Sequence, residues 1–340
     1  MPIIKKVLCT AAISEENKKR LCTALGEAEV IFVPSSAKKR IAEVGADVDA
    51  AIFEGNLDKS VLASPNLKWI HCCCAGVENS AIPEVFERNI VLTSSAGRSA
   101  SALAEHALLF IMALTYDLPG LGRAQAEHKW STGQGDSGRT GLYGKTVGII
   151  GLGNTGREVA RLCKGFRMTV LGWRRSRRPV PNVDQVFASD AGEGIDEILH
   201  RSDYVVLCAE LNNDTWHLMG SREFAQMKKS AYLVNVGRGS LIDESAMTDA
   251  LKNGIIAGAG LDTFETEPLP ERSSLWDLPN VMITPHVTPM LPDREERMLA
   301  YVFENIKAYL ESGAFVNRVM PCSMLTKNQH LQQAPEAVRT

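Results

Sequence analysis

The stretch Val147-Gly-Ile-Ile-Gly-Leu-Gly-Asn-Thr-Gly156 runs from an apolar segment into a Gly-x-Gly-x-x-Gly turn, and the helix-forming residues Arg157-Glu-Val-Ala-Arg-Leu162 follow it. A strand, a glycine-rich turn and a helix in this order are typical of dinucleotide-binding folds. We assign the tight turn to Gly151, the close approach of a pyrophosphate to Gly153, and close contact between helix and strand to Gly156. A turn that needs its glycines only for local contact is the alternative.

Apolar runs alternate with helical patterns on both sides of this stretch. The downstream strands are expected at 146–150, 168–172, 203–208, 231–235, 257–261 and 281–283, with helices at 154–165, 193–201, 221–227 and 243–253. The upstream strands are expected at 5–9, 29–33, 50–53 and 67–70, with helices at 14–26 and 35–45. Apolar strands separated by helices of this length favour parallel sheets covered on both faces. We therefore predict an α/β protein with two doubly wound parallel-sheet domains.

The chain of 340 residues exceeds the size at which single cores stop growing, about 250–300 residues. A dense apolar run at 100–118 predicts a long buried helix between domains, and an amphipathic pattern at 293–310 predicts a helix that returns to the first domain. We expect a Rossmann-type cofactor domain inserted in a flavodoxin-like substrate domain, with a cleft between them. The predicted boundaries are 1–99 with 287–318 for the substrate domain, 100–286 for the cofactor domain and 319–340 for a tail.

Composition limits the function classes. Hydrophobic residues make up 45% of the chain, charged residues 23%, and the net charge is −3, so no broad positive field favours nucleic acid or an anionic membrane. No apolar run approaches the roughly 20 residues of a membrane span, and Met1-Pro-Ile-Ile-Lys-Lys6 lacks the apolar core of a signal peptide. The eight cysteines lie mostly in apolar runs without a paired C-x-x-C. We expect a cytoplasmic protein with no metal site.

The cofactor choice depends on the residue 18 positions after Gly156. A carboxylate there would accept hydrogen bonds from the ribose hydroxyls of NAD. The chain instead has Trp173-Arg-Arg-Ser-Arg-Arg178, and guanidinium groups match the strongly negative adenosine 2′-phosphate. The sequence predicts NADP as the preferred cofactor, with NAD as the second candidate. A solvated basic loop is the alternative.

Three residues of complementary chemistry lie in separate turn-rich segments near the carboxyl ends of predicted strands: Arg238, Glu267 and His286. Ligand sites of open α/β sheets lie at such ends. Reduction of a 2-oxo acid needs a cation that polarises the ketone and an acid that protonates the forming alkoxide. A carboxylate bonded to the imidazole would raise the histidine pKa and keep its proton available. For Arg238 a surface position is the alternative, and His106, inside a helical run, is predicted to be a packed histidine.

Taken together, the sequence resembles the D-isomer-specific 2-hydroxyacid dehydrogenase family from about residue 50 to residue 318. The stretches that carry the resemblance are Ala75-Gly-Val-Glu-Asn79, Ala104-Glu-His106, Gly144-Lys-Thr-Val-Gly-Ile-Ile-Gly-Leu-Gly-Asn-Thr-Gly156, Asn235-Val-Gly-Arg-Gly239, Gly260-Leu-Asp262, Glu267-Pro268 and Leu275-Trp-Asp-Leu-Pro-Asn-Val-Met-Ile-Thr-Pro-His286.

By resemblance, Arg238 would bind the substrate, His286 would be the acid/base, and Glu267 would orient His286. The amides around Ala75, Gly76 and Val77 would hold the substrate carboxylate. The resemblance also implies a homodimer joined through the cofactor domain, with Trp130 reaching the active site of the partner. The residues assigned to the cofactor are Gly151, Gly153, Asn154, Thr155, Arg174, Arg175, Ser176, Glu210, Thr215, Val236 and, for the nicotinamide carboxamide, Asp262.

These expectations combine into an NADPH-preferring reductase that converts a small 2-oxo acid, similar to glyoxylate or hydroxypyruvate, into a D-2-hydroxy acid. Two alternatives stay open. One is a phosphite-type dehydrogenase on the same scaffold, and the other is a nucleotide-sensing, non-catalytic protein similar to the related corepressors. Turnover with 2-oxo acids separates the first prediction from both.

Overall fold

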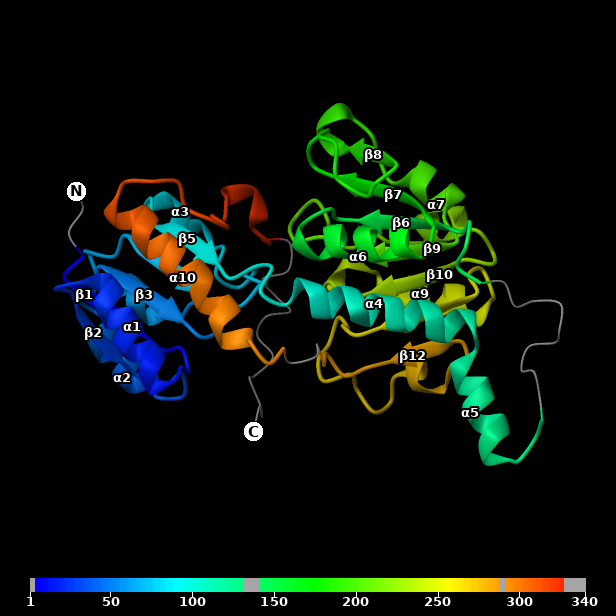
Figure 1. Cartoon of the computed structure of the whole chain (residues 1–340), viewed down its shortest axis with the longest axis horizontal. Coiled ribbons are helices and arrows are strands. Elements are labelled where there is room, and N and C mark those ends of the chain that lie inside the picture. The colour runs from blue at the N-terminus through cyan, green and yellow to red at the C-terminus, as the bar shows by residue number, and fades with distance from the viewer. Residues whose placement is uncertain (1–3, 131–140, 288–290, 327–340) are drawn as a thin grey trace. The chain divides into compact units, whose positions relative to one another are not determined.

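The computed structural model describes residues 4–130, 141–287 and 291–326. The chain divides into two compact units, of which Met1–Arg98 with Pro292–Thr340 form the first and Ser99–Leu291 form the second (Figure 1). Each unit contains one sheet in which all strands are parallel. The predicted fold of two parallel-sheet α/β domains is therefore confirmed. Within the predicted tail, residues 327–340 lie outside the described ranges.

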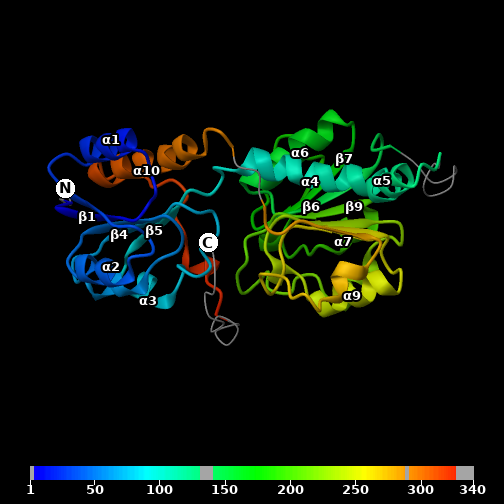
Figure 2. The same cartoon turned by 90° about the horizontal axis from the view of Figure 1, so that it is seen from below.

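The first unit has a five-stranded sheet in the order β2-β1-β3-β4-β5, which is the flavodoxin-like order. Its strands are β1 (Lys6–Cys9), β2 (Glu29–Phe32), β3 (Ala50–Phe53), β4 (Trp69–Cys72) and β5 (Val91–Ser94). Its helices are α1 (Glu15–Leu25), α2 (Lys38–Gly45), α3 (Pro83–Glu87) and α10 (Arg294–Leu310). Helices α1 and α10 cover one face of the sheet, and α2 and α3 cover the other (Figure 2).

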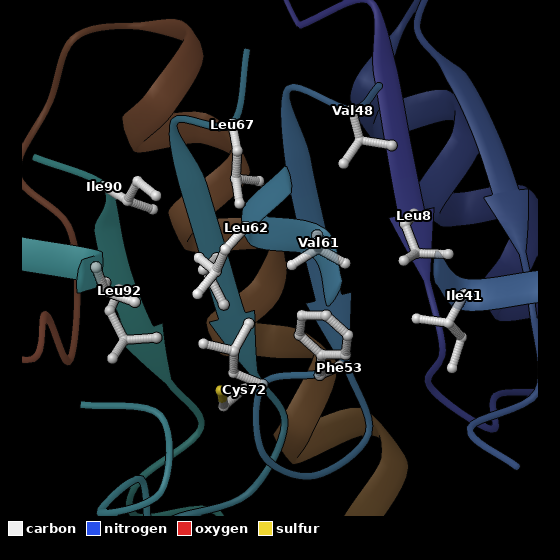
Figure 3. Packing of buried hydrophobic residues seen from close by; sticks show 14 of the residues in the cluster. Leu8, Ile41, Val48, Phe53, Val61, Leu62, Leu67, Cys72, Ile90 and Leu92 are labelled. Atoms are coloured by element: carbon white, nitrogen blue, oxygen red, sulfur yellow. The ribbon is translucent and has the colours of Figure 1, made fainter. Parts of the chain in front are cut away.

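Alternation along the strands of this unit fills both faces. Leu8 packs in the cluster on the α2 face together with Ile41 and Phe53 (Figure 3). Its neighbours Val7 and Cys9 pack in the cluster on the α1 and α10 face. Successive side chains of a strand point to opposite faces, so a strand covered on both sides is apolar throughout. This is why the upstream strands read as continuous apolar runs.

The second unit has a seven-stranded sheet in the order β12-β11-β10-β9-β6-β7-β8. Its strands are β6 (Thr146–Ile150), β7 (Thr169–Arg174), β8 (Gln185–Ala188), β9 (Tyr204–Leu207), β10 (Tyr232–Asn235), β11 (Gly258–Leu261) and β12 (Val281–Ile283). Its helices are α4 (Ala100–Thr115), α5 (Leu118–Ala126), α6 (Asn154–Gly165), α7 (Asp196–Arg201), α8 (Ser221–Gln226) and α9 (Glu244–Lys252). Strand β6 pairs with both β7 and β9, so the chain changes direction across the sheet there. Ligands of doubly wound sheets bind at this point.

The sequence missed β8, β5 and α3, which carry little apolar pattern. β8 (Gln185-Val-Phe-Ala188) begins with an exposed glutamine and pairs only with β7 at the sheet edge, although it is the third strand of the nucleotide fold; the predicted count of six omitted it. β5 (Val91-Leu-Thr-Ser94) ends in two polar residues, and α3 has only five residues.

The predicted helix at 100–118 is wrong at its end. Helix α4 stops at Thr115, and Asp117, with φ of 49°, accepts a hydrogen bond from Gly120 N at 3.1 Å and begins α5. An aspartate side chain that satisfies an N–H of the first turn favours a new helix over continuation of the old one. Among the described residues, no single helix is long and apolar enough to cross a membrane; α4 and α5 pass only as a pair, with a bend of 61° between them.

Candidate active site

The glycine-rich turn between β6 and α6 has no room for side chains at two of its positions. Gly151 has φ of 102°, and a Cβ there would lie 2.5 Å from Ala209 Cα. A Cβ on Gly156 would collide with the carbonyl oxygen of Gly151. Gly153, which precedes the first residue of α6, has open space around it. The geometry at Gly151 and Gly156 agrees with the roles assigned to them from the sequence, whereas the approach of a pyrophosphate to Gly153 stays a prediction.

Asn154 and Thr155 begin α6, and the basic segment lies at the end of β7, the neighbouring strand. Arg174 is the last residue of β7 and is half-buried. Burial, followed by the positive charges of Arg157 and Arg178, lowers the pKa of Arg174 below its ordinary value. Like charges held this close are costly unless an anion joins them.

The other basic side chains of this segment differ in their surroundings. Arg177 forms an ion pair with Glu193, which uses part of its charge within the protein. Arg175 is exposed, and the carbonyl oxygen of Ser176 accepts a hydrogen bond from the N–H of Arg178 at 2.9 Å. At this edge the charges of Arg157 and Arg178 act on Arg174, and the charge of Asp190 opposes them.

The loop after β9 holds two predicted cofactor residues. The hydroxyl of Thr215 donates to the carbonyl oxygen of Glu210 at 2.6 Å and accepts from Asn212 N at 2.9 Å, so this hydroxyl stabilises the loop itself. Val236, directly after β10, is buried. Contact of these residues with a cofactor stays a prediction.

The segment that carries Arg238 is fixed by its neighbours on both sides. The side chain of Asn235 donates to the carbonyl oxygen of Arg238 at 3.0 Å and accepts from Gly237 N at 3.0 Å. A side chain on Gly239 would collide with the backbone of Phe264, so this turn lies directly against the segment after β11. The backbone contact brings the Arg238 turn next to the segment of Glu267.

Glu267 and His286 form the predicted pair. Nδ1 of His286 lies 2.7 Å from Oε2 of Glu267, and Oε1 of Glu267 accepts a hydrogen bond from Phe264 N at 3.1 Å. The carboxylate is therefore held by one bond to the backbone while it orients the imidazole.

The electrostatics of the pair favour a charged imidazole. The hydrogen bond that His286 donates to Glu267 is the largest influence on the imidazole. Together with the negative charges of Glu267 and Asp262, it raises the pKa of His286 above its ordinary value against burial and the charge of Arg238. Burial would raise the pKa of Glu267, but the bonds from His286 and Phe264 and the charges of His286 and Arg238 outweigh it and lower that pKa. Arg238 thus lies near enough to act on both partners.

Asp262, at the end of β11, is buried beside this pair. Its Oδ1 accepts hydrogen bonds from the hydroxyl of Thr284 at 2.6 Å and from Val287 N at 3.0 Å. Within the described residues its buried Oδ2 has no hydrogen-bond partner. Sequence reasoning did not identify Thr284, because a threonine before Pro285 carries no recognisable signal by itself.

The remaining predicted residues lie elsewhere. Ala75, Gly76 and Val77 follow β4 in the first unit, where Cys74 Sγ lies 3.0 Å from the carbonyl oxygen of Gly76. Trp130 is fully exposed at the end of a described range. The roles implied for these residues stay predictions.

The amino-acid sequence matches a known protein family and several of its members. Residues 108–288 match the model of the D-isomer specific 2-hydroxyacid dehydrogenase, NAD binding domain. A glyoxylate reductase from Korarchaeum cryptofilum is 34% identical over 281 residues, which span 80% of this chain and 83% of that protein.

Solved structures agree. A glyoxylate reductase from Paecilomyes thermophila has a TM-score of 0.78 and 28% identity, with 94% of this chain and 99% of that chain covered. An NADPH-dependent glyoxylate/hydroxypyruvate reductase from Sinorhizobium meliloti, solved with NADP and sulfate, has a TM-score of 0.78 and 25% identity over 94% and 99% of the two chains. The chain therefore belongs to the D-isomer-specific 2-hydroxyacid dehydrogenase family and is an NAD(P)-dependent oxidoreductase.

Proposed function

We propose that the protein reduces a small 2-oxo acid, of the size of glyoxylate or hydroxypyruvate, with NADPH and releases a D-2-hydroxy acid. The observation that carries the proposal is the bond of 2.7 Å between Glu267 and His286, with the charge of Arg238 acting on both. The glyoxylate reductases among the relatives support the substrate class.

His286 acts as the proton donor in this proposal. Because Nδ1 bonds to Glu267, the proton that can be transferred resides on Nε2. The raised pKa favours the charged imidazole, and the alkoxide that forms on the former ketone oxygen takes the Nε2 proton. After the transfer, the ion pair becomes a neutral imidazole beside the Glu267 carboxylate.

Arg238 binds the 2-oxo acid and stabilises the negative charge that develops on the ketone oxygen. The Asn235 side chain and the contact of Gly239 with Phe264 hold the turn in place, so little reorganisation is needed when the substrate binds. The amides of Ala75, Gly76 and Val77 are proposed to bind the substrate carboxylate.

The residues present fit a nicotinamide cofactor. When bound, the reduced nicotinamide supplies the hydride. The buried Oδ2 of Asp262 accepts from the carboxamide amide group, which gives this oxygen the partner it lacks among the described residues. The guanidinium groups of Arg174, Arg157 and Arg178 favour binding of the 2′-phosphate of NADPH. The relative from Sinorhizobium meliloti, which was solved with NADP, supports the same cofactor.

A screen of 2-oxo acids that follows NADPH oxidation, repeated with NADH, tests the proposal. We expect turnover with glyoxylate or hydroxypyruvate, and faster turnover with NADPH at low cofactor concentration. If the protein reduced no 2-oxo acid but oxidised phosphite with the oxidised cofactor, the phosphite-type dehydrogenase would be the better assignment. Cofactor binding without turnover across the panel would instead favour a sensing role.

The same proposal includes a homodimer. Apolar side chains are exposed along α4, α5 and the segment after α5, among them Leu109, Leu118 and Trp130. Sedimentation velocity of the wild type tests this assembly, and a monomer at all concentrations contradicts it. If the wild type is a dimer, loss of activity in Trp130→Ala supports the role of Trp130.

A further inference from the structure

A series of hydrogen-bonded polar side chains leads from helix α4 to the candidate site through half-buried Thr284. His106 of α4 is 5% exposed and Asp262 is 1% exposed. Nε2 of His106 lies 3.0 Å from Oγ1 of Thr284, and that hydroxyl lies 2.6 Å from Oδ1 of Asp262. The imidazole itself lies 3.9 Å from Oδ1, too far for a direct hydrogen bond. Contact between His106 and Asp262 therefore runs through the threonine.

The chemistry of the three groups fixes the direction of each hydrogen bond. An ionised carboxylate only accepts, so the Thr284 hydroxyl donates its single hydrogen to Asp262. The same oxygen must then accept from Nε2–H of His106. His106 is a donor in this series, and its ring also packs against Phe110 with the centroids 4.8 Å apart. The hydrogen bond and the ring contact together set the position of the imidazole.

This series of hydrogen bonds engages one carboxylate oxygen of Asp262 and leaves the other available to a ligand. Oδ1 of Asp262 accepts from Thr284 and from Val287 N, whereas buried Oδ2 has no partner within the described residues. Two donors on one oxygen hold the plane of the carboxylate and so aim the other oxygen. The bond to Val287 N also restrains the backbone beside His286, whose φ is 51°.

We propose that His106 is a positioning residue. Through Thr284 it holds Asp262 so that Oδ2 accepts the amide hydrogen of the nicotinamide carboxamide. His106 touches neither the cofactor nor the substrate in this arrangement. The inference rests on the proposed contact between Asp262 and the carboxamide, and it replaces the sequence-based interpretation of His106 as a packed histidine alone.

The test compares two ligands that differ in the nicotinamide. Calorimetry measures the dissociation constants of NADPH and of 2′-phospho-ADP-ribose, which lacks the nicotinamide, for the wild type, His106→Leu and His106→Gln. We expect His106→Leu to weaken NADPH by about tenfold, the effect of one hydrogen bond, and to leave the fragment unchanged. His106→Gln should restore most of the loss, because its amide N–H can replace Nε2–H. Equal changes for both ligands, or no change for either, would overturn the inference.

Thr284→Val provides a second variant that keeps the shape of the side chain and removes the hydroxyl. We expect the same selective loss of NADPH affinity, with no further loss when His106→Leu is added. Additive losses would show that the two residues act separately and would contradict the relay.

Asp262→Ala separates this inference from the proposal on which it rests. A selective loss of NADPH affinity in Asp262→Ala, without one in His106→Leu, overturns the role of His106 only. If Asp262→Ala binds both ligands as the wild type does, the contact with the carboxamide and the relay both fail. A parallel set with NADH and ADP-ribose makes these results independent of the preference for the 2′-phosphate.

Discussion

Two turns of the second unit, one after β6 and the other after β11, are determined in different ways. At the first, glycines set the backbone: a side chain at Gly151 or Gly156 has no room. At the second, hydrogen bonds between distant residues set the side chains, as between Glu267 and His286 or Asp262 and Thr284. The first should control how the phosphates of the cofactor bind, and the second should control how the nicotinamide is held and reacts. Substitutions at the two turns should therefore have separable effects.

The largest effect is expected at the second turn. His286→Asn removes the proton donor, so kcat for 2-oxo acid reduction should fall by about 10²–10⁴-fold, the usual contribution of a positioned acid. The dissociation constant of NADPH should stay within about twofold, because the glycine-rich turn is unchanged. Steady-state kinetics and calorimetry measure the two quantities. A normal kcat in His286→Asn would mean that another group supplies the proton.

Arg238→Ala should have the second-largest effect on 2-oxo acid reduction. Loss of the guanidinium removes a group that stabilises the developing negative charge, which costs about 3–4 kcal/mol of transition-state stabilisation, as for an oxyanion donor. Arg238→Lys keeps the charge without the planar fork and should lose less. The ratio of kcat/KM between wild type and each variant gives the cost. Equal activity of Arg238→Ala and the wild type would exclude Arg238 from the reaction.

The basic end of β7 should affect cofactor choice without affecting chemistry. Arg174→Asp should raise KM for NADPH by about 10–100-fold, since a charge-assisted hydrogen bond contributes about 1.5–3 kcal/mol. The KM for NADH should change far less, and kcat at saturation should hold. Exposed Arg175 provides a matched substitution with a smaller expected effect. Equal increases for both cofactors would contradict the assignment of the 2′-phosphate.

The smallest effect concerns the glycine-rich turn itself. Gly156→Ala places a methyl group against the carbonyl oxygen of Gly151 and should cost about 1–3 kcal/mol of unfolding free energy, with weaker NADPH binding. Gly165, in the last turn of the same helix, has open space around it, so Gly165→Ala should be neutral or slightly stabilising, by about 0.4–1 kcal/mol. Denaturant titration measures both. Equal stability of the two variants would contradict the steric account of the turn.

The contrast between the two turns explains how much of the fold and of the site could be predicted from the sequence. The glycine-rich turn follows from local rules, and β6, α6 and β12 begin and end where the sequence places them. Arg238 and His286 were predicted because each follows an apolar strand, and Glu267 because a carboxylate in a nearby turn could orient the imidazole. The link from His106 to Asp262 joins residues 156 positions apart, since 262 minus 106 is 156, and only the folded chain brings their side chains together. Edge strand β8 escaped prediction because exposed Gln185 and half-buried Val186 leave only two buried apolar residues in it.

The pH dependence of kcat/KM for 2-oxo acid reduction, in the wild type and in Glu267→Gln, tests the central claim most directly. The protonated imidazole is the active form, and its pKa is raised, so reduction should decline as pH rises past a pKa that lies above the ordinary histidine value. Glu267→Gln removes the charge that raises the pKa, and the decline should move to lower pH. A decline at the same pH in both proteins would contradict the account, because the group that titrates would not be His286 bonded to Glu267.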